Sequence, residues 1–241
     1  MLPIETRVIR REALVQPEGR TRGWAQADFD GIPAGHPQRL DFAPLRMFAQ
    51  GTMLPGEGFD MHRHEGIDNV LLVRSGHFRH RGGDGSDWVL GPNDVFAMSA
   101  GTGAEHAEHV QGDEPVECIV IWLHSDPPLE GARQSRAHLD PTEARNRLAP
   151  LASGGALRCG GLSLQCDAAI LCAELHPGAQ LEHVMPAGER AYVAALDGNV
   201  TVAGQSLRQA DRAMLAGTGA VPISSQDGGT VAVVRMLAPP A

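Results

Sequence analysis

Hydrophobic positions along the chain gather in short runs that are separated by turn sequences. PGEG at 55–58 and GPND at 91–94 are strong turn sequences. Apolar runs of strand length lie around them, namely LRMFAQGTML, IDNVLLVRSG, VFAMSA and VECIVIWLHS. Short strands at this spacing predict an antiparallel sandwich or barrel. No run of about 18 consecutive apolar residues occurs, so we expect no transmembrane helix and no membrane partner.

A second series of strand-like runs follows residue 150, and it includes AAILCAEL, AYVAAL, NVTVAG, DRAMLAG and TVAVVRML. The stretch between the two series is rich in proline and charge, and we expect one helical turn in its PTEARNRL segment. The first forty residues show no clear strand pattern, and we expect them to be irregular and to wrap the edge of a barrel. The sequence therefore predicts an all-β protein with two antiparallel barrels in tandem, at 1–125 and 151–241, joined by a linker at 126–150.

Composition narrows the choice of compartment and partner. The net charge is −9 and no basic run stands out, so we expect no direct contact with nucleic acid. The N-terminal segment lacks the apolar centre of a secretory signal peptide, which predicts a cytoplasmic protein. The four cysteines form no CxxC pair, which favours free thiols in a reducing compartment. A zinc site made from Cys159, Cys166 and Cys172 is the alternative for these residues.

Two pairs of side chains carry the candidate chemistry. His62 and His64 are separated by one residue, and His106 and Glu108 repeat that spacing on a later segment. Residues two apart in a strand point to the same face, so both pairs can enter one barrel interior if their strands are neighbours. Three imidazoles and one carboxylate suit a divalent iron, copper, nickel, cobalt, manganese or zinc ion. The alternative is a structural β protein whose histidines bind nothing.

Four further histidines are weaker candidates. We expect each of them to be a surface or hydrogen-bonded residue, and we single out only His80, because it could lie near the mouth of the site. The four are His77, His80, His124 and His183.

Two motifs around the candidate ligands resemble the pirin family. GFDMHRH at 58–64 resembles G-F-x-x-H-P-H, and MSAGTGAEHAE at 98–108 resembles M-x-A-G-x-G-x-x-H-x-E. RAYVAALDGNVTVAG, near the C-terminus, looks like the pirin-like bacterial quercetin 2,3-dioxygenases. The resemblance implies a bicupin of two jelly-roll barrels, with one metal ion in the N-terminal barrel alone. Its ligands would be His62, His64, His106 and Glu108, and iron(II) is the expected ion.

The sequence also departs from the family pattern near the site. Arg63 replaces the proline between the first two histidines, and Asp68 stands where a glutamate is usual. The segment at 80–83 reads HRGG and lacks the acidic residue and the serine of the family's H-x-D-S. These changes leave the four expected ligands intact but alter their surroundings.

The resemblance further implies an oxidoreductase that opens a flavonol such as quercetin, or a related enolic ring, with O2. The metal would acidify the substrate hydroxyl, and Glu108 could accept the proton as a general base. Phe59, Met61 and Met98 are candidates for lining an apolar pocket. The alternative function is a metal-bearing, redox-sensing regulatory protein that binds a protein partner.

Overall fold

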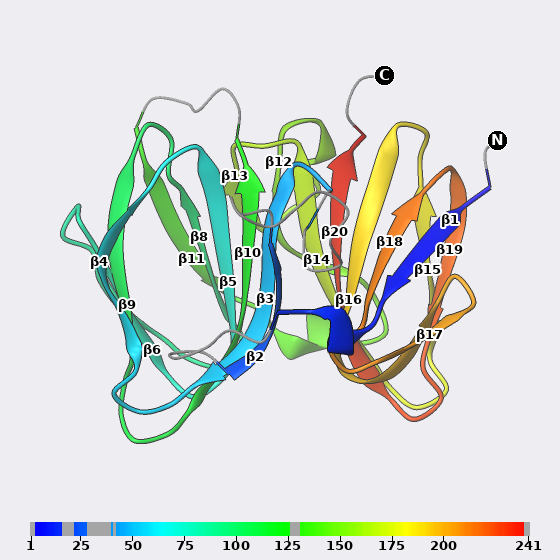
Figure 1. Ribbon diagram of the computed structural model, residues 1–241, viewed down its shortest axis with the longest axis horizontal. Helices are drawn as coiled ribbons and strands as arrows, with labels where there is room; N and C mark the ends of the chain where they lie inside the picture. The colour runs from blue at the N-terminus through cyan, green and yellow to red at the C-terminus, as the bar shows by residue number, and fades with distance from the viewer. Residues whose placement is uncertain (1–2, 16–21, 28–39, 41, 126–130, 239–241) are drawn as a thin grey trace. The chain divides into compact units, whose positions relative to one another are not determined.

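The computed structural model describes residues 3–15, 22–27, 40, 42–125 and 131–238, and nearly all regular structure in them is β-strand (Figure 1). The helical elements within these residues are three single turns, η1 (Arg11–Ala13), η2 (Pro141–Glu143) and η3 (Gly155–Leu157). None of the described helices is long and apolar enough to cross a membrane. The all-β class and the bicupin architecture expected from the sequence are confirmed.

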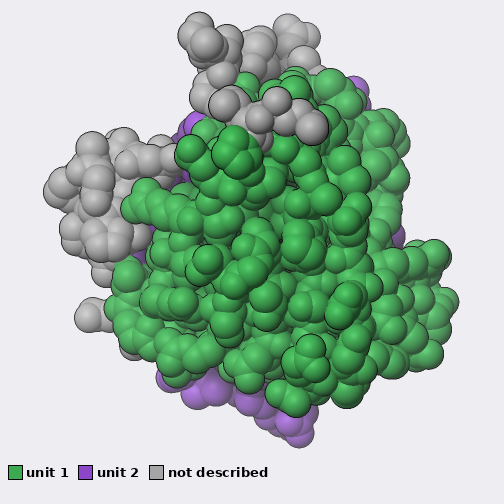
Figure 2. Space-filling view, turned by 90° about the vertical axis from the view of Figure 1, so that its right-hand side faces the viewer, with its two compact units in different colours: residues 1–14, 140–161, 167–241 green, residues 15–139, 162–166 purple. Residues whose placement is uncertain are grey.

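The chain divides into two compact units (Figure 2). The unit here called the N-terminal barrel contains Val15–Leu139 and Leu162–Cys166. The unit here called the C-terminal barrel contains Met1–Leu14, Asp140–Gly161 and Asp167–Ala241. Each barrel therefore includes a short segment from the opposite half of the sequence. The domain boundaries expected from the sequence, 1–125, 126–150 and 151–241, concern segments that would fold on their own, and they remain a prediction.

The N-terminal barrel is built from two antiparallel sheets. One has the strand order β11-β8-β5-β10-β3-β2 and the other has the order β4-β9-β6-β7. A short strand, β13, belongs to the same unit. The strands are β2 (Arg22–Ala27), β3 (Leu45–Met53), β4 (Gly58–His64), β5 (Ile67–Ser75), β6 (Phe78–Gly82), β7 (Asp87–Leu90), β8 (Asp94–Ser99), β9 (Ala104–Val110), β10 (Val116–His124), β11 (Arg133–His138) and β13 (Leu162–Leu164).

Strand alternation explains the core of this barrel. On β5 the side chains of Ile67, Leu71 and Val73 lie in one buried hydrophobic cluster, which also receives Phe96 and Met98 from β8. Residues two apart share a face, so the same alternation directs the intervening side chains away from the cluster. Most inner positions of these strands are apolar, so a polar side chain at an inner position marks a candidate functional site.

The C-terminal barrel repeats the architecture around an apolar interior. Its main sheet contains β1-β18-β16-β20-β14-β12, while β15 pairs with β19, and β17 and β19 pair with β16. The inner face of β16 contributes Ala191, Val193 and Ala195 to the core cluster. The strands are β1 (Glu5–Ile9), β12 (Ala149–Gly154), β14 (Ala168–Leu175), β15 (Gln180–Met185), β16 (Glu189–Val202), β17 (Gln205–Arg208), β18 (Arg212–Ala216), β19 (Gly219–Ser224) and β20 (Gly229–Leu237).

The structure corrects the expectation of an irregular N-terminus. Strand β1 pairs with β18, and β2 pairs with β3, so two strands lie in the first forty residues. Residues 16–21 and 28–39 of that stretch lie outside the described residues. The helical turn expected in PTEARNRL is present as η2, where the Asp140 carboxylate accepts a hydrogen bond from the Thr142 backbone N–H. The predicted linker also contains β11, which pairs with β8.

A buried carboxylate fixes the segment that contains β13. Asp68 is completely buried on β5 and accepts hydrogen bonds from the backbone N–H groups of Gln165 and Cys166, at 2.9 Å each. The Ser99 hydroxyl donates to its other oxygen. A buried charge needs such partners, and hydrogen bonds to an ionised acceptor are among the stronger ones. The aspartate at this position therefore attaches residues from beyond 160 to the N-terminal barrel.

Candidate metal centre

The two predicted pairs lie on neighbouring antiparallel strands. Strand β4 pairs with β9 so that His62 stands opposite His106. The register shifts between Phe59 and His62, which marks a bulge at this end of β4. Bulges redirect side chains and are frequent beside functional sites. The spacing in the sequence and this register together bring the histidines from two distant segments into one place.

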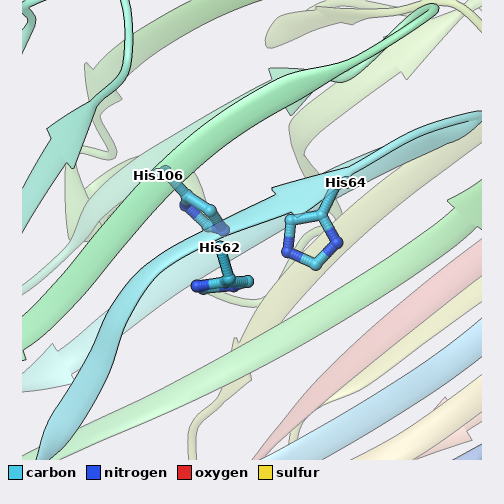
Figure 3. A group of neighbouring side chains, drawn as sticks. All are labelled: His62, His64 and His106. Carbon is cyan, nitrogen blue, oxygen red and sulfur yellow. The ribbon is translucent and has the colours of Figure 1, made fainter.

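Three imidazole rings converge in the barrel (Figure 3). The ring centroid of His62 lies 4.8 Å from that of His64 and 4.5 Å from that of His106, and the last two are 4.9 Å apart. One nitrogen from each ring lies within 4.8 Å of the others, which is close enough for all three to hold one metal ion. The rings come from β4 and β9 and point toward one another.

The hydrogen bonds of these rings leave nitrogens available. Nδ1 of His62 donates to the Asp60 backbone carbonyl oxygen at 2.7 Å, which leaves its Nε2 with a lone pair. Nε2 of His64 and Nε2 of His106 are buried and have no hydrogen-bond partner among the described residues. A buried polar atom without a partner costs about 1–3 kcal/mol. Buried nitrogens that lack a partner, on imidazole rings that lie this close together, therefore fit a metal ion well.

Burial keeps the inner histidines neutral. It lowers the pKa of His64 to about 4, with a further contribution from the charges of His62 and Arg46. Burial also lowers the pKa of His106 to about 2, and the neighbouring histidines act in the same direction. A neutral imidazole is the form that binds a metal ion, so these two rings need not lose a proton first at neutral pH.

Glu108 lies beside this group but on a different side of His106. Its side chain is only 11% exposed, and Oε1 is 3.5 Å from Nδ1 of His106. The carboxylate forms a second, overlapping group with His80 and His106, whereas His62 and His64 belong to the first group. Burial raises the pKa of Glu108 to about 7. The structure thus gathers three of the four predicted ligands and places the fourth against one of them.

His80 occupies a position that the sequence did not reveal. It is completely buried on β6 rather than near the mouth of the site, and its Nε2 lies 3.1 Å from Nδ1 of His106. Burial lowers its pKa to about 4. His183 is also buried, in the C-terminal barrel, and His77 is exposed. The pairing of β6 with β9, which places His80 opposite Glu108, is the fact that a single sequence could not supply.

Arg63 bridges the site strand to a neighbouring turn. Its Nη2 donates to the Thr102 backbone oxygen at 2.6 Å and to Glu65 at 3.0 Å. The guanidinium lies over Gly103, where an added Cβ would be 2.0 Å from Nη1. Gly103 also has φ +150°, a conformation that other residues rarely adopt. The arginine that replaces the family's proline therefore ties β4 to the turn that precedes β9.

A mostly apolar cavity of about 470 Å³ adjoins His62, His64 and Glu108. Three small lining residues, Ala25, Ala49 and Gly51, leave room for it. Phe59 lines the cavity as expected, whereas Met61 and Met98 are not among the lining residues, and Met61 is half exposed. The remaining lining residues are Val15, Ala27, Met47, Met53, Asn69, Phe78, Cys118, Val120 and Trp122.

The fold and the site together define a bicupin with a candidate metal centre in its N-terminal barrel. The family model described as Pirin matches residues 35–123, and the one described as Quercetinase C-terminal cupin domain matches residues 151–234. The chain belongs to the pirin family.

Individual relatives agree with this assignment. A protein of Pseudomonas aeruginosa, named as a candidate quercetin 2,3-dioxygenase, is 29% identical over 76% of this chain and 79% of its own length. A pirin-like protein of Caulobacter vibrioides is 25% identical over 94% of this chain and 99% of its own. The crystal structure of YhhW from Escherichia coli covers 98% of this chain and 99% of its own with a TM-score of 0.87, at 20% identity. A second structure shows the same bacterial pirin in complex with nickel(II), with a TM-score of 0.86.

Proposed function

We propose that this protein is a metal-dependent dioxygenase that opens the ring of a flavonol such as quercetin, or of a related enolic compound, with O2. The observation that carries the proposal is the convergence of His62, His64 and His106 beside an apolar cavity. Relatives named as candidate quercetin 2,3-dioxygenases support the choice of substrate class. A cavity of this volume is in the range that binds small organic ligands.

One divalent metal ion would be held by His62, His64, His106 and Glu108. Iron(II) is the expected ion, and nickel, copper, cobalt, manganese and zinc are the alternatives, because such ligands do not select one of them. When bound, the ion supplies a Lewis acid that acidifies a coordinated hydroxyl group and places the electron-rich ring next to O2. The orphaned Nε2 atoms of His64 and His106 support this ligand set.

The residues of the chain would perform three tasks around the ion. Nonpolar side chains such as Val120 and Phe59 would bind the aromatic ring and keep water away from it. Glu108, whose pKa burial raises to about 7, is suited to accept the proton of the substrate hydroxyl near neutral pH. Nδ1 of His62, bound to the Asp60 carbonyl, would hold that ring with Nε2 toward the ion.

A redox-sensing regulatory protein that binds a protein partner is the second candidate function. The observation in its favour is that Phe59 and Met61, on the strand that carries two of the histidines, are 40% and 50% exposed. Exposed apolar side chains beside a site can contact a partner. The cavity favours the enzyme, because a purely regulatory metal needs no space for a substrate.

Metal analysis followed by a turnover assay tests the proposal. The purified chain should contain about one equivalent of metal, and His62→Ala should lose it, while His77→Ala, a change at an exposed histidine of the same barrel, should not. The protein is then loaded without oxygen with iron, copper, nickel, cobalt or manganese and is mixed with quercetin and air. Loss of the flavonol absorbance supports the proposed activity. No loss with any of the five ions would exclude quercetin as the substrate, and no bound metal would exclude the site.

A further inference from the structure

His106 has different neighbours at its two ring nitrogens. Nδ1 lies 3.1 Å from Nε2 of His80, and both rings are completely buried. Nε2 has no hydrogen-bond partner among the described residues. The nitrogen that remains available to an ion shared with His62 and His64 is therefore Nε2, and the opposite side of the ring is occupied by His80.

This arrangement has a consequence for the proton on the ring. A neutral imidazole that binds a metal through Nε2 must carry its proton on Nδ1. That N–H is buried here, and an acceptor must satisfy it, because metal-bound histidines depend on such a partner for their orientation. Nε2 of His80 is at hydrogen-bond distance, whereas Oε1 of Glu108 is farther away at 3.5 Å. The carboxylate of Glu108 is also assigned to the ion in the proposed ligand set.

Packing holds the ring of His80 in a fixed place. Its centroid lies 4.1 Å from that of Phe96 and 5.8 Å from that of Trp88, and the plane of the Trp88 ring is inclined by only 22° to that of His80. Strand β6 pairs directly with β9, with Gly82 opposite His106. The side chain is therefore fixed by two aromatic rings and by the register of its strand, which suits a residue that orients another.

We propose that His80 is a positioning residue that accepts the Nδ1–H of His106 and so directs Nε2 of His106 toward His62 and His64. The inference rests on the proposed metal site and adds to it a residue outside the four ligands. Without the ion, the hydrogen bond between the two rings can run in either direction, because either ring can carry the shared proton. Binding of the ion selects the direction in which His106 donates, and His80 then carries its own proton on Nδ1. That atom is buried without a hydrogen-bond partner among the described residues, so the bond from His106 to the ion must outweigh the cost of leaving it unpaired.

The test compares two substitutions of the same residue in the full-length chain, with zinc(II) as the probe. His80→Phe keeps an aromatic ring packed against Phe96 and Trp88 but removes the acceptor, while His80→Gln offers an amide oxygen in place of Nε2. The zinc dissociation constant is measured by competition with a coloured chelator at about pH 7.5. We expect His80→Phe to weaken binding by about 10- to 100-fold, which is the usual effect of removing such a partner. His80→Gln should stay within about 3-fold of the wild type, because it restores the acceptor.

A spectroscopic measurement checks the direction of the hydrogen bond. Nitrogen-15 spectra of the imidazole groups in the zinc-loaded wild type should show the His106 proton on Nδ1. His77→Phe is the matched control and should change neither this signal nor the affinity. Thermal unfolding of the zinc-free variants shows whether the substitutions merely weaken the fold.

Several outcomes would overturn the inference. Wild-type affinity in His80→Phe would do so while leaving the proposed metal site intact, whereas absence of zinc binding by the wild type would remove the metal site itself. An equal loss of affinity in both His80 variants, with equal losses in thermal stability, would show a purely structural role. Retention of one zinc equivalent by His62→Ala, together with its loss in His80→Phe, would make His80 a ligand in the group with His106 and Glu108.

Discussion

Glu108 should make the metal-free protein less stable as the pH rises. Burial raises the pKa of its carboxyl group from 4.5 to about 7. The folded protein therefore holds this proton more tightly than the unfolded chain does between pH 4.5 and about pH 7. Since the folded state binds more protons in this window, the free energy of unfolding falls as the pH increases through it.

The size of the effect follows from the shift. One pKa unit corresponds to about 1.36 kcal/mol, so the whole shift is worth roughly 3 kcal/mol, most of which is lost between about pH 5 and pH 8. Glu108→Gln replaces the acid by a neutral group of similar shape. We expect the free energy of unfolding of this variant to match that of the wild type near pH 5 and to exceed it by roughly 2–3 kcal/mol near pH 8.

Thermal unfolding in the presence of a strong chelator provides the assay. The chelator is essential, because a bound cation would stabilise the ionised carboxylate and hide the effect. For a chain of this length, a difference of roughly 2–3 kcal/mol corresponds to a difference in Tm of roughly 5–10 °C near pH 8. Glu105→Gln, an exposed change on the same strand, is the control and should follow the wild-type profile. Parallel profiles for wild type and Glu108→Gln would refute the claim that desolvation governs this carboxyl group.

Three further predictions concern the ion, the segment that Asp68 binds, and the cavity. Glu108 must lose a proton with a pKa of about 7 before it can bind an ion, so below about pH 7 the zinc affinity of the wild type should fall more steeply than that of Glu108→Gln, by about tenfold per pH unit. Equal slopes of affinity against pH in competition titrations would contradict this. Asp68→Asn should lower the free energy of unfolding by about 1–3 kcal/mol in urea titrations, because the backbone N–H groups of Gln165 and Cys166 lose a charged acceptor. An unchanged urea midpoint would show that these two hydrogen bonds contribute little. Ala49→Phe should fill part of the cavity and reduce quercetin turnover at least about tenfold with the metal content unchanged, and full turnover would place the substrate elsewhere.

The sequence was sufficient for the histidine cluster because strand geometry is simple. Side chains two apart share a face, so the pattern at 62 and 64 needed only a neighbouring strand, and β9 is that strand. The positions of His80 and of the Glu108 carboxylate could not be predicted in the same way. They depend on the register between β6 and β9 and on side-chain rotamers, and neither leaves a periodic signal in one sequence.

The strands near the N-terminus were missed for a related reason. Strand β1 is a five-residue strand whose partner, β18, lies some two hundred residues away. Its alternation is short and carries two charged residues, so nothing local distinguishes it from a loop. Only the sheet that receives such a strand determines that it forms.

The exchange of short segments between the two halves of the chain affects how the protein can be synthesised. The N-terminal barrel includes Leu162–Cys166, and the C-terminal barrel includes Met1–Leu14. On a ribosome, the first barrel therefore cannot acquire its last segment until residue 166 has emerged, and the first strand must wait for β18 before it has a partner. Both barrels should consequently mature late in translation, and a gene cut between them would deprive each product of part of its own structure.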